Sequence, residues 1–554
     1  VGYGAYRGPW AMESLVRETA LDVAARRIGI DPIDIRRRNL VTLSDQPTVS
    51  SMEIPLEDIT PAECLEKLLN AFDVDAFRQE QLAARKDGRY LGLGLATYIE
   101  PTGSAGTFST TTGELAQVRI EPTGKVTVSM STHSQGHSTV TTMAQIFADR
   151  LGVPYEDVTV FEGDSSFGGF SCGAAGSRQG VIAGGAAIKA ADLLVDKVKQ
   201  VAGHVMEVDP ELIYIEESRV CVTGDPDNSR PLSAIADIAY GDPNSLPVGF
   251  DMGLETQYRY QPPPMTFASA ANACVVEVDT DTGFVKILRW ISSEDCGTAI
   301  NPAVVEGQVA GGLAQAIGMV LLEEFSFDDR GNPITATYKD YKLPAISDIP
   351  DFEFVHASTP SQSVGGMRGC GEGGAIIGAP VLVNAIADAL SPFGEVPVDL
   401  PLTPVKLLSV VEGRDLATQT APAKAPENNV AQQSSVDTSP SMQPEQGAMP
   451  ASEAVVIDGT WNMVLSTPMG PQEMTGYFST EDDVLSGCLE SPEGKMDFTG
   501  KVDGDQLMFD IKTEKPVKIT LKYKLAVTGD KISGKCKMGI FGSAKVNGER
   551  VVGD

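Results

Sequence analysis

Apolar residues recur at every third or fourth position in several parts of the first 411 residues, which is the spacing of an amphipathic helix. The clearest example covers residues 13–28 and is followed by the stop signals Gly29 and Asp31-Pro32. Four more helices are predicted, each beginning at a Gly-rich or Pro-marked segment, over 138–151, 177–205, 302–323 and 373–390. A helix that begins in this way presents unpaired N–H groups to whatever lies at its tip.

Alternation of apolar and polar positions predicts strands in the same part of the chain. Strands are predicted over 113–121 and 124–130, and a hairpin is predicted to join 273–278 to 284–291 through the turn at 279–283. Together with the helices, these strands place residues 1–411, taken as one domain, in the α+β (mixed α/β) class.

The chain changes character after residue 411. No aromatic residue occurs between Phe393 and Trp461, and residues 412–454 are rich in Pro, Gln, Ser and Ala. We expect a flexible linker there, because such a segment has too little apolar area to form a core. Residues 455–554 show about eight short runs separated by turn signals, which predicts a separate small antiparallel β barrel or sandwich. Its aromatic residues suit a filled apolar core better than a ligand cavity, and we assign it no chemistry.

The net charge narrows the choice of partners. The 554 residues include 43 Lys and Arg against 75 Asp and Glu, a formal charge of −32, so phosphate backbones and anionic membrane surfaces repel the chain. We therefore expect no nucleic-acid partner, and the sequence has no run of about 18 apolar residues that would predict a membrane span. The chain begins with neither Met nor a signal-like apolar stretch, and we expect that residue 1 is not the biological start.

The cysteines are scattered singly along the chain. Even the closest pair, Cys274 and Cys296, are far apart in sequence, and no C-x-x-C pattern occurs. This spacing disfavours a zinc ribbon or an iron–sulfur site made by this chain alone. Single cysteines in a chain of this length favour reduced thiols and a cytoplasmic location.

Four segments rich in small residues carry the candidate chemistry, and they cover 133–137, 168–179, 292–297 and 365–374. None contains G-x-x-x-x-G-K-[ST] or a G-x-G-x-x-G that follows a plausible strand, which disfavours ATP and NAD. Each segment alone is consistent with an ordinary turn. Four of them together favour a large phosphate-bearing cofactor, because small residues let backbone donors approach a polyanion closely.

Three kinds of side chain near these segments have alternative interpretations. Glu372, at the mouth of an apolar helix, is either a charge that complements the helix dipole or a desolvated general base with a raised pKa. His133 and His137 are four residues apart, but Gly136 between them and the lack of a nearby carboxylate disfavour a zinc site. Arg7 is as consistent with an ordinary surface arginine as with a functional one.

Several motifs occur together in one order along the chain. They are Ala5-Tyr-Arg-Gly8, Asp31 to Leu40, Gln135-Gly-His137, Gly176-Ser-Arg178, Asp295-Cys-Gly297, Asn301-Pro302, Val305 to Gln308 and Arg368 to Gly374. In this combination, residues 1–411 resemble the second half of the molybdopterin-binding large subunit of the xanthine oxidase family, of the aerobic carbon monoxide dehydrogenase large-subunit type. The C-terminal β domain is not part of the resemblance.

The resemblance implies roles for individual residues. Glu372 matches the family's catalytic glutamate, which removes a proton from the oxygen that attacks the substrate. The matched cofactor-binding positions are Gln135, Gly136 and His137 beside the pterin, Ser177, Arg178 and Gln179 at the dinucleotide phosphates, and Gly369, Cys370 and Gly371 flanking the pterin. Arg7 and Gly8 match the loop that faces the substrate. No side chain of this chain is implied as a metal ligand, because the pterin dithiolene holds the molybdenum.

An activity and an assembly follow from the same resemblance. We expect a molybdenum hydroxylase subunit that oxidises an aldehyde or an aromatic N-heterocycle with oxygen from water and binds molybdopterin cytosine dinucleotide. Its electrons would leave through an iron–sulfur subunit with 2Fe–2S clusters and a subunit that binds FAD. The expected heteromeric complex is a dimer of heterotrimers.

The sequence departs from the family in two places. Gly8-Pro9-Trp10 stands where copper-containing carbon monoxide dehydrogenases carry a Cys, which disfavours carbon monoxide as the substrate. The preceding half of the large subunit, with its Gly-Gly-Phe-Gly-Gly-type loop, is not found, so either another chain supplies it or the sequence is a fragment. The alternative hypothesis is a non-catalytic scaffold subunit that lacks a complete cofactor site.

Overall fold

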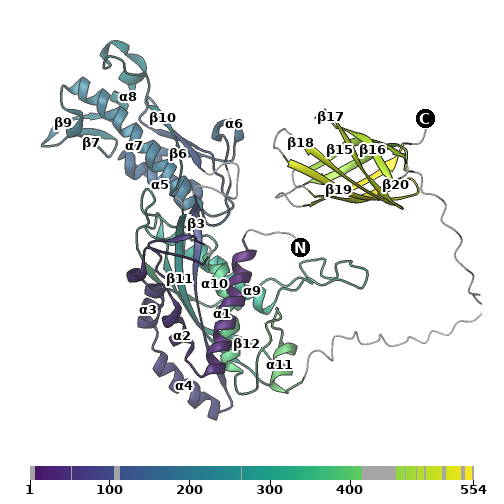
Figure 1. Ribbon diagram of the computed structural model, residues 1–554. Helices are drawn as coiled ribbons and strands as arrows, with labels where there is room; N and C mark the ends of the chain where they lie inside the picture. Colours follow the sequence, from purple (N-terminus) through teal and green to yellow (C-terminus); the bar gives the residue numbers. More distant parts are fainter. Residues whose placement is uncertain are drawn as a thin grey trace, which may run out of the picture. The chain divides into compact units, whose positions relative to one another are not determined.

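Two units make up the chain, Val1–Ala425 and Pro426–Asp554 (Figure 1). The computed structural model describes residues 6–51, 53–104, 113–171, 173–263, 265–414, 457–467, 470–481, 483–491, 494–513, 519–537 and 543–551. From residue 415 onward, the linker predicted over 412–454 lies outside the described residues.

A four-stranded sheet with the order β13-β12-β11-β3 organises the first unit. β11 (Met265–Val278) pairs antiparallel with β3 (Tyr90–Ser104) and β12 (Val285–Asp295), whereas β13 (Phe352–Ala357) runs parallel to β12. The predicted hairpin is confirmed in β11 and β12. Both strands are longer than predicted because small and polar residues, which show no clear apolar alternation, continue them into the core.

The two faces of β3 differ because Leu and Gly alternate along it. Leu91, Leu93 and Leu95 are buried in the core formed with α3 (Pro61–Ala71) and α4 (Val74–Lys86). Gly92 and Gly94 of β3 face α10 (Gly373–Ala389), and a Cβ at Gly94 would lie 2.0 Å from the carbonyl oxygen of Val381. The sheet therefore carries α10 in direct contact with its backbone, which fixes the position of the helix that begins after Glu372.

Two further helices, α1 (Pro9–Ile28) and α9 (Pro302–Leu321), contribute to the same core as α10. Within the described ranges, α9 is the one helix long and apolar enough to cross a membrane by length and composition. Its Val309, Leu313 and Ile317 are fully buried in the core. An apolar helix with this burial is what the interior of a large domain requires.

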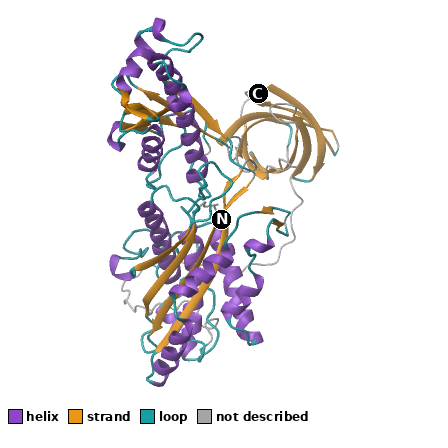
Figure 2. Ribbon diagram, turned by 90° about the vertical axis from the view of Figure 1, so that its left-hand side faces the viewer, coloured by secondary structure: helices purple, strands orange, loops and turns teal. Residues whose placement is uncertain are grey.

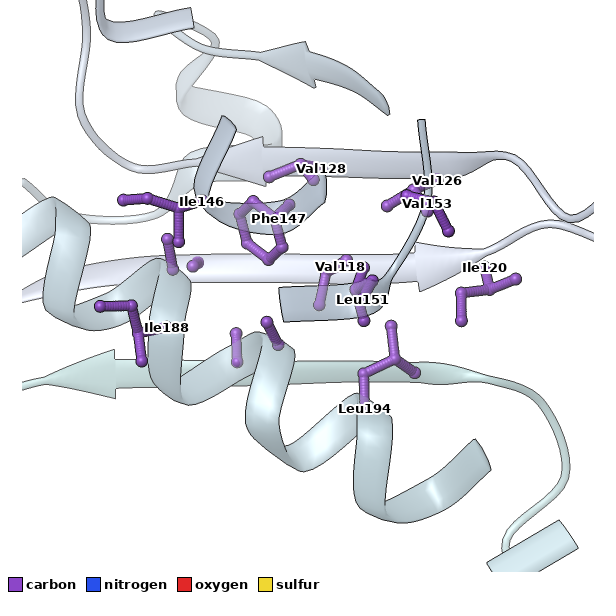
Figure 3. Close-up of a cluster of buried hydrophobic side chains, with 14 of the residues drawn as sticks. Val118, Ile120, Val126, Val128, Ile146, Phe147, Leu151, Val153, Ile188 and Leu194 are labelled. Carbon is purple, nitrogen blue, oxygen red and sulfur yellow. The ribbon is translucent and has the colours of Figure 1, made fainter. Parts of the chain in front are cut away.

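A second sheet of the first unit has the order β10-β4-β5-β6. Its strands are β10 (Glu255–Tyr260), β4 (Glu114–Ile120), β5 (Val126–Met130) and β6 (Val158–Phe161). The helices α5 (Thr139–Leu151) and α7 (Gln179–Met206) share its core. Figure 3 shows Val118, Val128, Phe147, Leu151 and Leu194 of this core between strands and helices.

The described residues also form shorter elements. They are α2 (Pro32–Asn39), α6 (Ser165–Gly168), α8 (Leu232–Gly241) and α11 (Pro404–Val411), the pair β1 (Thr48–Val49) and β2 (Pro55–Leu56), and the three-stranded sheet β7 (Ile213–Glu216), β8 (Arg219–Val222) and β9 (Asp225–Pro231).

The predicted helices occur with small shifts at their ends. The helix predicted over 13–28 begins at Pro9, because proline is well suited to the first helical turn. α7 begins at Gln179 rather than at residue 177, and α9 ends at Leu321 rather than at residue 323. The strands predicted over 113–121 and 124–130 correspond to β4 and β5.

The second unit is a closed antiparallel barrel, which selects between the two architectures predicted for it. Its strands are β14 (Gly459–Thr467), β15 (Gly470–Glu481), β16 (Val484–Ser491), β17 (Gly494–Asp503), β18 (Gln506–Thr513), β19 (Ile519–Thr528), β20 (Lys531–Lys537) and β21 (Ser543–Arg550). β14 pairs with β21 and closes the ring seen in Figure 2. Trp461, Phe509 and Tyr523 are buried in its apolar core, and the rings of Phe509 and Tyr523 stack with centroids 4.7 Å apart.

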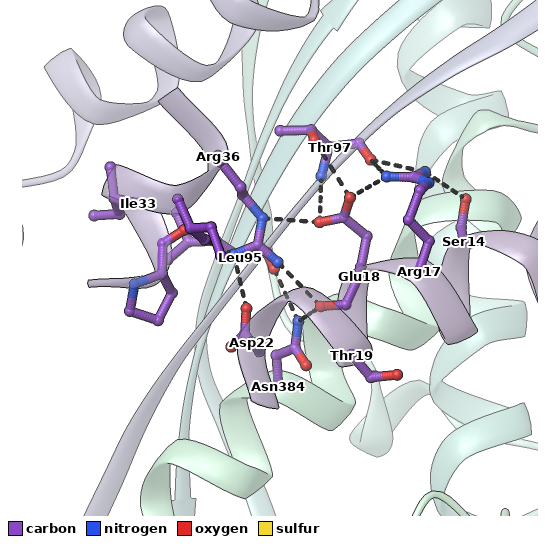
Figure 4. Close-up of polar contacts among 12 residues, drawn as sticks. Ser14, Arg17, Glu18, Thr19, Asp22, Ile33, Arg36, Leu95, Thr97 and Asn384 are labelled. Carbon is purple, nitrogen blue, oxygen red and sulfur yellow. Dashed lines mark hydrogen bonds and ion pairs between the residues drawn. The ribbon is translucent and has the colours of Figure 1, made fainter. Parts of the chain in front are cut away.

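A buried ionic network ties α1 and α2 to the first sheet (Figure 4). Arg36 of α2 donates from Nε to Glu18 of α1 at 2.8 Å, and its Nη1 lies 2.7 Å from Asp22 Oδ1. The N–H of Thr97 in β3 donates to Glu18 Oε2 at 3.2 Å, and Asn384 Nδ2 of α10 donates to the Glu18 carbonyl oxygen at 3.3 Å. The network thus connects α10 to α1 through Asn384.

Candidate cofactor and active site

The first residues of four helices line one cavity of about 440 Å³. Thr139 begins α5, Gln179 begins α7, Asn301 caps α9, and Glu372 precedes the first residue of α10. All four segments singled out in the sequence contribute to its wall, although they are up to about 240 positions apart. Four helix N-termini at one cavity favour an anionic ligand.

The cavity brings together most of the residues proposed from the sequence. Its lining includes Gln135, Gly136, His137, Ser177, Arg178, Gln179, Gly369, Cys370, Gly371 and Glu372. Arg7 and Gly8 are not among the lining residues, whereas their neighbour Tyr6 is. Arg7 instead pairs with Glu323, just after the end of α9, with 2.7 Å between Nη1 and Oε2. The loop at residues 6–8 therefore reaches the cavity through Tyr6, and Arg7 anchors that loop.

A close contact joins the loops before α7 and α10. A Cβ at Gly369 would lie 1.8 Å from the carbonyl oxygen of Ser177, so only glycine fits at this position. Ser177 itself adopts a left-handed conformation with φ of 52°, directly after Gly176 with φ of 63°. The strained turn places the Ser177 hydroxyl against the start of α10.

Burial governs the chemistry of Glu372. Its Oε1 accepts the N–H of Gly176 at 2.8 Å, and its Oε2 is buried without a hydrogen-bond partner among the described residues. Burial raises the pKa of Glu372 to about 7, and the Gly176 hydrogen bond offsets only part of this effect. The side chain makes no capping hydrogen bond to α10, so the geometry favours the desolvated-carboxyl interpretation over the helix-capping one.

His137 is held in one tautomer by its neighbours. Its Nδ1 accepts the N–H of Gln135 at 3.1 Å, which leaves the proton on Nε2 for the side-chain oxygen of Gln179. Gln179 Nε2 in turn donates to the carbonyl oxygen of His133 at 3.1 Å. The 135–137 loop and the start of α7 thus form one rigid wall. No group of three or more His, Cys, Asp or Glu side chains that could hold a metal ion occurs in the part of the chain that the structure describes.

Cationic groups also line the cavity. Arg368 donates from Nε to the Thr359 carbonyl oxygen at 2.8 Å and from Nη1 to that of Phe267 at 2.6 Å. Its Nη2 is buried and has no hydrogen-bond partner in the described ranges. Arg178, the second guanidinium of the wall, lies 3.6 Å from Glu114. An unused buried donor beside helix N-termini is suited to an anionic group of a ligand.

Sequence reasoning missed two buried carboxyl groups close to the cavity. Glu100 of β3 and Glu294 of β12 are 0% and 3% exposed. A glutamate inside a run of buried strand residues, as in Tyr98-Ile99-Glu100, is the signal that would have identified them, because a buried carboxyl group needs a special environment.

Comparison with known proteins defines the class of this site. The family model described as the molybdopterin cofactor-binding domain matches residues 67–350, which include the cavity segments before α5, α7 and α9. The fold and the site are therefore those of a molybdopterin-binding protein. More particularly, the chain belongs to the xanthine oxidase family of molybdopterin oxidoreductases, as the sequence resemblance implied.

Three relatives illustrate the similarity. The chain is 37% identical over 418 residues to the nicotine 6-hydroxylase large subunit of Paenarthrobacter nicotinovorans, which is 74% of this chain and 51% of that protein. It is 33% identical over 414 residues to the carbon monoxide dehydrogenase large chain of Hydrogenophaga pseudoflava, covering 72% and 51%. The structure of quinoline 2-oxidoreductase from Pseudomonas putida 86 superimposes with a TM-score of 0.70 at 38% identity, covering 74% of this chain and 53% of that one. The chain thus spans about half the length of the relatives it matches.

The cavity fits a phosphate-bearing pterin cofactor. The unused Nη2 of Arg368 and the four helix N-termini supply donors for anionic groups, and the backbone at Gly371, where no atom lies closer than 3.8 Å to the position of a Cβ, is open to a flat ring system. Gly136, with φ of 99°, has no atom within 4 Å of the position a Cβ would take. These features suit a ligand that is held by backbone groups rather than by metal-ligating side chains.

Proposed function

We propose that the chain is the catalytic part of a molybdenum hydroxylase that oxidises its substrate with oxygen derived from water. The observation that carries this proposal is Glu372, a buried carboxyl group with an unpartnered oxygen at the wall of the cofactor cavity. When bound, the molybdenum cofactor supplies the redox centre that accepts the electron pair of the substrate.

Glu372 acts as the general base. With a pKa of about 7, a substantial fraction is ionised at neutral pH, yet the carboxylate retains enough basicity to accept a proton. The Gly176 N–H fixes Oε1, so the proton is taken up at Oε2, the oxygen that has no partner among the described residues. Tyr6 lines the same cavity as this carboxylate.

The remaining wall residues hold the cofactor. Gln135 to His137 would hold the pterin, and Ser177, Arg178 and Gln179 would receive the phosphates at the start of α7, where backbone N–H groups and the helix dipole favour negative charge. Gly369, Cys370 and Gly371 would flank the pterin, and the close fit of Gly369 against the Ser177 carbonyl oxygen would hold this part of the wall in place. The dinucleotide is the cytosine form.

The substrate is an aromatic N-heterocycle or an aldehyde. Nicotine 6-hydroxylase and quinoline 2-oxidoreductase are named for aromatic N-heterocycles, and both are 37–38% identical to this chain. Carbon monoxide is disfavoured, because Gly8-Pro9-Trp10 offers no thiol for copper after Arg7. In the cell, the complex is cytoplasmic and passes electrons to iron–sulfur and FAD subunits in a dimer of heterotrimers.

Metal and pterin analysis of the purified complex tests the proposal. We expect stoichiometric molybdenum and pterin, together with hydroxylation of quinoline- or nicotine-like heterocycles that incorporates oxygen from labelled water. A complex that contains only traces of molybdenum and no pterin would overturn the proposal and support the scaffold alternative.

An exposed apolar segment of the chain indicates that a further segment packs against it. Residues 324–348 project from the end of α9 with almost no regular structure (Figure 1), and Phe325, Tyr338 and Ile346 are 57%, 87% and 91% exposed. The rings of Phe325 and Phe327 contact each other, with centroids 5.0 Å apart. A hydrogen bond from the Tyr341 hydroxyl to Glu323 holds the base of the arm. We propose that this 324–348 arm packs against a segment equivalent to the part of the relatives' large subunit that this chain does not match, in the same or another polypeptide.

Co-purification tests the arm. In the complex that carries the double substitution Tyr338→Ser and Ile346→Ser, we expect the companion segment to be lost on purification where it is a separate chain, or to become sensitive to protease where it belongs to the same polypeptide. Val248→Ser, at an exposed apolar position elsewhere, should cause neither change. Retention of the companion in the arm variant would place its interface elsewhere.

A further inference from the structure

Glu100 and Glu294 are buried near Glu372 but differ in how well they are satisfied. Glu294 accepts a hydrogen bond from Ser292 at 2.7 Å and has Asn272 and Tyr98 within 3.4 and 3.5 Å. Glu100 has one hydrogen-bond partner in the described ranges, the hydroxyl of Ser177 at 2.7 Å, and its Oε2 is buried without any. Hydrogen-bond donors therefore surround the Glu294 carboxyl group and can stabilise its charged form. The Glu100 carboxyl group lacks such a set of donors.

The Ser177 hydroxyl connects Glu100 to Glu372. Its oxygen accepts the backbone N–H of Glu372 at 2.9 Å, and its proton is donated to Glu100 Oε1. Because the hydroxyl has a single proton, the bond to Glu100 fixes the rotamer in which Ser177 receives the start of α10. Glu100 thus determines, through one side chain, where the backbone of Glu372 lies.

Charge near Glu100 favours its neutral form. The groups that act on it electrostatically are Glu372 and Glu294, and Glu100 in turn acts on Tyr6 and Cys370, all of which are acidic or neutral. Burial first, and then the charge of Glu372, hold the pKa of Glu100 well above its usual range. Two buried carboxyl groups that interact in this way titrate as a pair, and one of them keeps its proton when the other ionises.

We propose that Glu100 is a positioning residue: it remains protonated while Glu372 ionises, and it anchors Ser177 so that the Glu372 carboxylate meets the substrate in a fixed orientation. This proposal rests on the proposed function of Glu372. A neutral Glu100 lets Glu372 be the member of the pair that titrates in the working pH range. A charged Glu100 would instead oppose ionisation of Glu372.

Three variants of the purified complex separate the possibilities. Glu100→Leu removes the acceptor for Ser177, and we expect kcat to fall about tenfold or more with KM and molybdenum content unchanged. Glu100→Gln supplies a neutral oxygen acceptor, so it restores most of kcat and leaves the acidic limb of the pH profile near 7. Glu294→Gln, a buried carboxyl without a bond to Ser177, is the matched control and leaves both quantities close to wild type.

Infrared titration supplies a readout that does not require turnover. Well above pH 7, where Glu372 and Glu294 are ionised, we expect the C=O stretch of one protonated carboxyl group to persist in the wild type and in Glu294→Gln, and to vanish in Glu100→Gln. If the band is unaffected by Glu100→Gln, or if that variant moves the acidic limb down by a pH unit or more, Glu100 is charged in the native protein and the proposal is wrong. A complex without molybdenum would defeat the proposed function but leave this spectroscopic result to decide the state of Glu100.

Discussion

Burial, rather than its place at the start of a helix, sets the chemistry of Glu372. The position in the sequence was compatible with a capping charge, but the side chain turns away from α10 and meets the Gly176 N–H. A carboxyl group that loses water and gains a single neutral donor is destabilised when charged, so its pKa rises to about 7. The same residue type on the exposed face of α4, Glu80, has no such environment.

Replacing Glu372 tests its role as the base. In Glu372→Gln, shape and the hydrogen bond from Gly176 are retained while the proton acceptor is lost, and we expect turnover to fall by a factor on the order of 10² or more at unchanged cofactor content. In the wild type, kcat/KM should rise with pH through about 7, because the carboxyl is neutral below that value and can accept a proton only above it. Glu80→Gln is the control and should behave as wild type. A Glu372→Gln enzyme with most of its activity would reassign this residue to a structural role.

Substitution of Arg36 tests how much a single buried residue contributes to the stability of the first unit. Arg36→Met removes the buried cation between Glu18 and Asp22, which then keep only the more exposed Arg17 and Arg26 as partners, and we expect a loss of about 3–5 kcal/mol in the free energy of unfolding of the first unit. Arg37→Met breaks the half-exposed pair with Glu66 and should cost about 0–1 kcal/mol. Urea denaturation of both variants measures the difference. Equal effects would show that the buried network does not carry the stability assigned to it.

At the scale of elements, the sequence predicts helices and strands whose faces carry apolar side chains. It does not predict those whose faces carry small residues. α5, α7, α9 and α10 were predicted because Leu, Ile, Val and Ala recur at helical spacing. β3 was missed because Gly92 and Gly94 begin its α10-facing surface, and a missing side chain leaves no apolar signal. The extensions of β11 and β12 were missed for a related reason, since Ser, Asn and Glu there are buried through hydrogen bonds that only the fold reveals.

The candidate site, too, could be predicted only in part from the sequence. Glycine-rich helix entrances could be recognised one by one, and the motif order indicated that they belong together. Their convergence on one cavity depends on long-range packing, such as the contact of Gly369 with Ser177, which no local pattern encodes. Arg7 was assigned to the substrate loop by resemblance, but its pairing with Glu323 depends on a residue more than 300 positions away.

Gly94 tests the direct packing of α10 on β3. In Gly94→Val, the new Cβ would lie 2.0 Å from the Val381 carbonyl oxygen and 2.3 Å from the Ala385 nitrogen, so the backbone of α10 must move. We expect a loss of about 1–3 kcal/mol or more, together with reduced activity, because Glu372 moves with the helix. Gly307→Ala in α9, where nothing lies within 4 Å of the added Cβ, should change the free energy of unfolding by less than about 1 kcal/mol. Thermal unfolding and turnover of both variants make the comparison, and an active, stable Gly94→Val enzyme would contradict it.

At the scale of the whole molecule, the proposed chemistry is assigned to residues of the first unit. Every residue that lines the cavity lies between Tyr6 and Glu372, and the second unit has its own apolar core and its own closed ring of strands. Among the described residues of the barrel, the pairing of β14 with β21 leaves no strand edge that requires another domain for its stability.

We therefore expect that the barrel folds without the first unit and that the complex is active without the barrel. Expressed alone, residues 455–554 should fold cooperatively, because the core around Trp461 and Phe509 is made entirely within this unit. The complex whose chain ends before residue 455 should keep its molybdenum and its rate of substrate oxidation, since no group of the barrel lines the cavity. Circular dichroism of the isolated barrel and steady-state kinetics of the truncated complex measure the two outcomes. Loss of turnover in a truncated complex that still binds molybdenum would show that the barrel contributes to substrate access or to electron transfer, and would assign chemistry to a domain to which its sequence assigns none.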